Sequence, residues 1–198
     1  MEEGYIKYQC HWKETALPDE LAIENLIAYR NVLFEKGWIG VYADGIGFGN
    51  ISERYKNRQF IISGTQTGHF PVCDASHFAL VTHYHVLNNE VYCKGKVKAS
   101  SESLTHAILY ELYPDVNAVL HIHDLNLWRR LLQKVPTTRA NVTYGTVEMA
   151  FEVARLSEFE GLREKGIFVM AGHEEGIVTF GNDMATALDI LLDFEKDR

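Results

Sequence analysis

The segment that decides the fold reads NAVLHIHD and covers residues 117–124. Its β-branched and apolar residues are typical of a buried strand. Because alternate side chains of a strand share a face, His121 and His123 are expected to point the same way. Two imidazoles side by side are half of a transition-metal site, which still needs a third donor from elsewhere in the chain. The spacing alone also fits an exposed strand face, so both interpretations stay open.

A helix is predicted upstream, beginning at Ser100, Ser101 and Glu102 and ending before Pro114. Its apolar residues recur at helical spacing: Leu104, Ala107, Ile108 and Leu112. Serine hydroxyls and backbone N–H groups at a helix start form a ready anion site. Glu102 is then either a carboxylate close to the histidine pair or an ordinary first-turn acid favoured by the helix dipole.

A third candidate donor follows a short apolar strand near the C-terminal end. His173 lies in FVMAGHEEG, residues 168–176, where that strand runs into a turn, and it is the only histidine after His123. A strand pair and a strand-end histidine make a three-histidine site plausible, with Glu102 nearby.

These motifs, taken in order, resemble the class II aldolase/adducin family, which includes fuculose-phosphate aldolase. The resemblance runs from about Asp19 to the C-terminal helix. Each short motif is weak alone, but the ordered set is specific: GNISER at 49–54, ISG at 62–64, SSE at 100–102 with His106, PDVNAVLHIH at 114–123, and GH at 172–173.

The resemblance implies roles for nine residues. His121, His123 and His173 would bind one divalent ion per chain, usually zinc, and Glu102 would be the acid/base carboxylate. Five further residues match positions that cradle the substrate phosphate in the family: Asn50, Ser63, Gly64, Ser100 and Ser101.

The chain departs from the family at three places. The family usually has glycine directly after the third histidine, whereas two glutamates separate His173 from Gly176 here. The aldolases supply a tyrosine proton donor from a longer segment, but residues 132–143 contain no tyrosine, and Tyr144 matches a different position. The sequence ISGTQTGH at 62–69 stands where the family commonly has Thr-Pro-Ser/Thr-Gly.

Mixed strand and helix patterns predict an α/β layered fold. The resemblance makes this one three-layer α/β/α domain over residues 1–198, with a central, mostly antiparallel mixed sheet, assembled as a homotetramer. It implies a metal-dependent lyase that performs retro-aldol cleavage of a sugar phosphate or related hydroxy-ketone through an enediolate. The alternatives are a dehydratase or decarboxylase using the same metal site, and a non-catalytic adducin-like module.

Composition sets further expectations. The 198 residues are 46% hydrophobic, enough for a substantial core without disulfides. A net charge of −8 argues against a nucleic-acid or anionic-membrane partner. Three cysteines without C-x-x-C spacing are assigned no role, and the N-terminus has no secretory pattern, so a cytoplasmic protein is expected.

The remaining segments predict ordinary elements. Helices are expected from Pro18-Asp19 to Gly37, over 124–135, over 146–165, and over 183–193 after an Asn182 cap. Strands are expected at 59–62, 167–171 and 176–180, and a hairpin over 79–93. The glycines at 45–49 do not precede a helix, which argues against a dinucleotide-binding loop.

Four other histidines have open or modest roles. His83 and His85 form a second H-x-H, interpreted as a solvent-facing strand pair because no motif places a third donor beside them. His106 either orients Glu102 or is a buried hydrogen-bonded histidine. A substrate-pocket role for His69 stays open.

Overall fold

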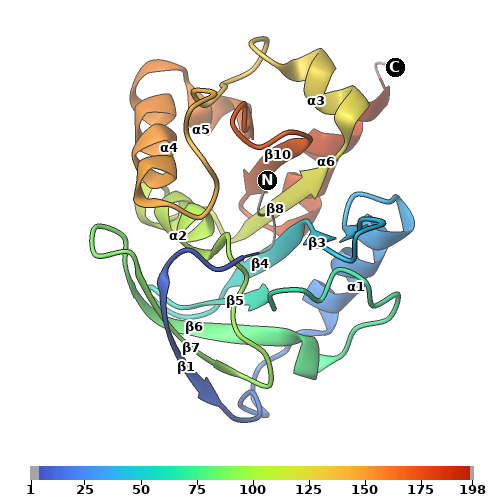
Figure 1. Ribbon diagram of the computed structural model, residues 1–198, viewed down its shortest axis with the longest axis vertical. Helices are drawn as coiled ribbons and strands as arrows, with labels where there is room; N and C mark the ends of the chain where they lie inside the picture. The colour runs from blue at the N-terminus through green and yellow to red at the C-terminus, as the bar shows by residue number, and fades with distance from the viewer. Residues whose placement is uncertain (1–4, 197–198) are drawn as a thin grey trace.

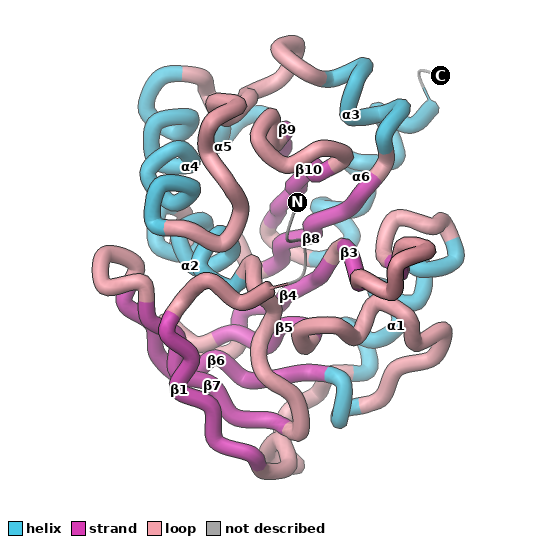
Figure 2. Tube along the Cα trace, viewed as in Figure 1, coloured by secondary structure: helices cyan, strands magenta, loops and turns pink. Residues whose placement is uncertain are grey.

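The computed structural model describes residues 5–196, and its centre is one eight-stranded sheet (Figures 1 and 2). The strand order is β1-β7-β6-β5-β4-β8-β10-β9. Only β1 and β7 pair in parallel, and the other neighbours are antiparallel. The strands are β1 Gln9–Glu14, β4 Asn50–Arg54, β5 Phe60–Ser63, β6 Phe78–His85, β7 Glu90–Gly95, β8 Ala118–His123, β9 Ile167–Val169 and β10 Gly176–Gly181; β2 Gly40–Val41 and β3 Gly47–Phe48 form a separate pair.

Helices cover both faces of the sheet, which confirms the predicted three-layer α/β fold (Figure 1). One face packs against α2 and α4, and the other against α1, α3 and α6. The helices are α1 Glu24–Glu35, α2 Ser103–Leu112, α3 Leu125–Leu131, α4 Val147–Phe159, α5 Leu162–Lys165 and α6 Met184–Lys196, with a 3₁₀ turn η1 at Ala75–His77. No helix within residues 5–196 has the length and apolar character to cross a membrane.

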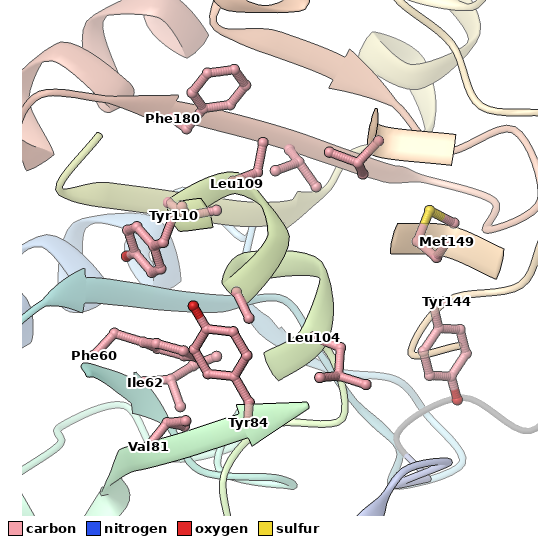
Figure 3. Packing of buried hydrophobic residues seen from close by; sticks show 14 of the residues in the cluster. Phe60, Ile62, Val81, Tyr84, Leu104, Leu109, Tyr110, Tyr144, Met149 and Phe180 are labelled. Atoms are coloured by element: carbon pink, nitrogen blue, oxygen red, sulfur yellow. The ribbon is translucent and has the colours of Figure 1, made fainter. Parts of the chain in front are cut away.

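The alternation of strand side chains divides the core into two clusters. Phe60 and Ile62 of β5 point toward α2, where Figure 3 shows them packed beside Leu104 and Tyr110. Ile61, between them in sequence, belongs to the cluster under α1 and α6. A strand that alternates in this way is apolar on both faces because both faces are covered.

The histidine strand β8 lies between β4 and β10, in the interior of the sheet. His121 pairs with Asn50 of β4, and His123 pairs with Gly176 of β10. All six residues of β8 are buried. The prediction of a buried strand is therefore confirmed, and the alternative of an exposed strand face is wrong.

Several predicted boundaries are wrong for local reasons. The first helix begins at Glu24, because Pro18 to Leu21 forms a turn in which the carbonyl of Pro18 accepts from the Leu21 N–H. The predicted helix over 146–165 is two helices, divided at Gly161, whose φ of 62° is left-handed. The helix predicted over 124–135 ends at Leu131.

The C-terminal helix also starts differently from the expectation. Asp183, rather than Asn182, accepts from the Thr186 N–H at 2.7 Å at the helix start. The hairpin over 79–93 is confirmed. The helix that ends before Pro114 is confirmed as well, although it begins at Ser103 and not at Ser100.

Candidate metal centre and substrate pocket

Three buried histidines converge from two distant parts of the chain. His121 and His123 come from β8, and His173 comes from the turn that links β9 to β10. The Nε2 atom of His123 lies 3.1 Å from Nε2 of His121 and 3.0 Å from Nε2 of His173. Each side chain is less than 5% exposed. The structure thus brings the three predicted ligands together.

This arrangement fits a divalent transition-metal ion. Zinc–imidazole bonds are 2.0–2.1 Å long, so two nitrogens on one ion lie about 2.9–3.4 Å apart. Burial lowers the pKa of His121, His123 and His173 below the usual histidine value. The imidazoles are therefore neutral near pH 7, which is the form that binds a metal.

Tyr42 and Glu175 orient one of these imidazoles. The Tyr42 hydroxyl donates to Oε2 of Glu175 at 2.6 Å and lies 2.8 Å from Nδ1 of His123. Since the hydroxyl hydrogen is directed to Glu175, the Tyr42 oxygen accepts from Nδ1–H of His123, and Nε2 keeps its lone pair for a metal. Sequence reasoning missed both residues, although the extra glutamates after His173 were a visible signal.

Glu102 lies at the start of α2, 3% exposed, and lines the same cavity as His121 and His123. Within the described chain its side chain makes no capping hydrogen bond to α2. Glu102 therefore lines the cavity and does not cap α2 through its side chain. This placement supports the proton-transfer interpretation of Glu102 over that of a first-turn acid.

The cavity has a mostly polar lining. Four of the five predicted phosphate-binding residues line it: Asn50, Gly64, Ser100 and Ser101. Tyr144 also lines the cavity, and its ring lies 4.7 Å from the His173 ring. Among the described residues the lining contains no lysine or arginine, so an anion there would meet neutral donors.

Ser63, the fifth predicted phosphate-binding residue, is not among the residues that line the cavity. Its Oγ accepts from the backbone N–H of Ile51 at 3.1 Å and donates to the carbonyl of the same residue. The hydroxyl therefore contributes to the pairing of β5 with β4.

Arg30 of α1 stabilises the loop that forms one side of the cavity, and the sequence alone did not indicate this role. Its guanidinium donates to the backbone carbonyls of Thr67 at 3.0 Å, Gly68 at 3.2 Å and Phe70. The side chain is 1% exposed. Thr67 and Gly68 line the cavity, so Arg30 holds this side of the pocket in place.

The remaining histidines have separate environments. His106 is fully buried, and its Nδ1 lies 2.7 Å from Oγ of Ser52, so the hydrogen-bonded alternative is confirmed. Burial lowers the pKa of His106 to about 3. His69 is exposed and contacts the carbonyl of Gln66 at 3.1 Å, outside the cavity lining. His83 and His85 face solvent, as predicted.

Comparison with known proteins agrees with this geometry. The family model of the class II aldolase and adducin N-terminal domain matches residues 24–196. A methylthioribulose-1-phosphate dehydratase of Yersinia enterocolitica is 33% identical over 131 residues, which are 65% of this chain and 55% of that protein. The one of Marinobacter nauticus is 26% identical over 200 residues, covering 88% of this chain and 89% of that protein.

Solved structures share the fold. An L-fuculose 1-phosphate aldolase superposes with a TM-score of 0.68 at 21% identity, covering 91% of this chain and 84% of that chain. A sugar-phosphate aldolase from Thermotoga maritima gives 0.67 at 23% identity, covering 88% and 90%. The family match includes every strand of the main sheet except β1, together with the three histidines and Glu102, and the chain therefore belongs to the class II aldolase and adducin N-terminal domain family.

Proposed function

We propose that this protein is a divalent-metal-dependent lyase that acts on a small sugar phosphate or related hydroxy-ketone. One observation carries the proposal: three neutral imidazoles and the buried carboxylate of Glu102 line a single polar cavity. A structural module of the same fold has no need for this convergence, which argues against the non-catalytic, adducin-like alternative.

In this proposal His121, His123 and His173 hold the ion, and we infer zinc, which favours a small set of nitrogen donors with an open position. A bound ion would act as a Lewis acid on a substrate carbonyl. Glu102 moves the substrate proton, since it lines the same cavity as the ligands and is shielded from bulk water. Ser100 and Ser101 bind the substrate phosphate through their hydroxyl donors at the start of α2. Gly64 lines the same cavity, but its backbone N–H donates to the carbonyl of His77 at 2.8 Å.

Retro-aldol cleavage and dehydration both fit this set of residues, because each begins or ends with proton transfer beside a polarised carbonyl. Two observations support dehydration as a second candidate reaction, beside retro-aldol cleavage. The curated relatives described above are named as dehydratases. Residues 132–143 also lack the tyrosine that aldolases of this family use as a proton donor. We further propose a homotetramer in the cytoplasm, on the basis of the family resemblance alone.

The test is a panel of ketose 1-phosphates incubated with the zinc-loaded protein and followed by mass spectrometry. Cleavage gives two smaller carbonyl compounds, and dehydration gives one product lighter by one water molecule. Chelator-treated protein should be inactive and should recover when zinc is restored. The double variant His121→Ala/His123→Ala should be inactive, whereas His77→Ala, which removes a histidine outside the cavity, should remain active. Turnover that persists without metal would contradict the proposal.

A further inference from the structure

A second pair of histidines lies on the outer part of the sheet, away from the candidate metal centre. His83 and His85 belong to β6 and are exposed, while Tyr84 between them is buried. Their Nε2 atoms are 3.0 Å apart, and the rings are nearly perpendicular, at 89°. None of the residues that line the candidate substrate pocket belongs to β6.

A β-bulge directs both histidines to the open face of the sheet. Val81 pairs with Cys93, but His83 pairs with Tyr92, so the register shifts by one residue between Val81 and His83. A one-residue shift reverses which side chains point to which face. Val81 and Tyr84 consequently share the core under α2, and the two histidines point away from it.

The spacing of the two nitrogens matches that at the candidate metal centre. The 3.0 Å separation is close to the 3.1 Å between His121 and His123. With metal–nitrogen bonds of about 2.0–2.1 Å, this separation corresponds to an angle near 90–100° at the ion. Such an angle is compatible with neighbouring positions on a divalent transition-metal ion, and imidazole donors suit Ni²⁺ and Cu²⁺ as well as Zn²⁺.

Neighbouring strands restrict the two rings. Tyr92 of β7 contacts the rings of His83 and His85, at centroid distances of 5.7 and 6.4 Å, and His11 of β1 stacks on Tyr92 at 4.2 Å. Glu90 is paired in register with His85, so its carboxylate lies on the same face of the sheet. The pair is thus presented on a rigid aromatic surface beside a negative charge.

We propose that His83 and His85 form a second, surface metal site that chelates a divalent transition-metal ion with a preference for imidazole donors, such as Ni²⁺ or Cu²⁺. Water would complete the coordination shell. The site binds more weakly than the three-histidine centre, because it offers two imidazoles instead of three and is open to solvent. This proposal does not depend on the proposed lyase activity.

The test uses Ni²⁺ and the full-length chain, with binding measured by isothermal titration calorimetry and bound metal counted after equilibrium dialysis. The wild-type protein should bind a tight ion and a second, weaker one. His83→Ala and His85→Ala should each weaken the second site at least about tenfold, which is 1.4 kcal/mol. The double variant should lose the second site and keep the tight one.

Two comparisons make the result specific. His11→Ala removes a histidine from the same sheet face without touching the chelating pair, and it should retain both ions. His121→Ala/His123→Ala should lose the tight ion and retain the weaker one. Because both histidines of the pair are exposed, the thermal unfolding midpoint of His83→Ala/His85→Ala without metal should match that of wild type. Equal Ni²⁺ stoichiometry and affinity in wild type and this double variant would overturn the proposal and leave a hydrogen-bonded pair.

Discussion

The hydroxyl oxygen of Tyr42 lies 2.8 Å from Nδ1 of His123, although 81 positions separate the two residues in the chain. The same hydroxyl donates to Glu175, which follows His173 by two residues. One tyrosine thus joins the histidine strand to the turn that carries the third imidazole. This contact fixes both the ring and its tautomer, as partners of metal-binding histidines do.

Removing that hydroxyl should weaken metal binding without emptying the site. Tyr42→Phe keeps the ring but leaves Nδ1–H of His123 without its acceptor, so the tautomer that presents Nε2 is less favoured. We expect zinc affinity to fall by about 10–100-fold, measured by competition with a chromogenic chelator. Tyr55→Phe, a substitution outside the site, should change nothing. An unchanged affinity in Tyr42→Phe would remove the orienting role.

Loss of the proposed metal ligands themselves should weaken zinc binding more than loss of the Tyr42 hydroxyl. His121→Ala/His123→Ala should abolish tight zinc binding, because the remaining imidazole cannot hold the ion alone. His173→Ala should weaken binding sharply as well. Zinc is counted by mass spectrometry after dialysis at submicromolar free metal, so that weaker sites stay empty. Retention of one zinc by His173→Ala would remove that residue alone from the ligand set.

Glu102→Gln tests the proposed proton transfer. The amide keeps the shape of the carboxylate and removes its basicity, so the general-base contribution of about 10²–10⁴-fold in rate should disappear. Metal binding and the unfolding midpoint should be preserved. Metal-dependent exchange of the α-proton of dihydroxyacetone phosphate in D₂O, followed by NMR, provides the assay. Equal exchange by wild type and variant would show that Glu102 has no such role.

Local sequence patterns were sufficient for the elements that frame the site. The alternation in residues 117–124 predicted β8, and the spacing of Leu104, Ala107 and Leu112 predicted α2. These patterns work because period 2 and period 3.6 are properties of neighbouring residues. They place a side chain on a face, but they do not identify its partner.

Features that depend on distant partners were not predictable in this way. Ser63 stands next to the predicted phosphate loop, yet its hydroxyl bonds to the Ile51 backbone of the adjacent strand. Arg30 looks like an ordinary charged position on a helix, yet it is buried against carbonyls 37 to 40 residues away. The break at Gly161 has a local cause, not a distant partner. The helical sequence pattern continues across Gly161, but the left-handed backbone of this residue separates two helices.

Arg30→Met should destabilise the protein and loosen the pocket together. Methionine fills much of the space but removes the Arg30 donor from the carbonyls of Gly68 and Phe70, whereas the Thr67 carbonyl still accepts from the Phe70 N–H at 3.3 Å. Buried unsatisfied polar groups cost about 1–3 kcal/mol each before relaxation, so we expect a loss of about 2–4 kcal/mol in the free energy of unfolding. Urea unfolding measures this loss, and phosphate binding should weaken in parallel.

The matched control for Arg30 is Arg58→Met. Arg58 is exposed and pairs with Glu111 at the surface, so its replacement should cost less than about 1 kcal/mol. Equal stability of the Arg30 and Arg58 variants would contradict a supporting role for Arg30.

The buried His106 should make the metal-free protein sensitive to acid. An unfolded histidine titrates near pH 6.5, whereas burial lowers the pKa of His106 to about 3 in the folded state. Between these values the unfolded chain binds a proton that the folded chain does not, so the free energy of unfolding must fall as the pH falls. One such proton changes stability by about 1.4 kcal/mol per pH unit. Above about pH 7 both states are neutral and the contribution is constant.

The measurement is urea unfolding of metal-free wild type and His106→Asn between about pH 7.5 and 5. Both proteins retain the three cavity histidines, whose pKa values are also lowered by burial, so both should lose stability toward acid. The free energy of unfolding should fall more steeply with falling pH in the wild type, because its unfolding takes up one more proton than that of the variant. The substitution also removes the bond to Ser52, so the variant should be less stable at every pH. Parallel pH profiles would mean that His106 is already protonated in the folded protein, or that the unfolded chain does not protonate it.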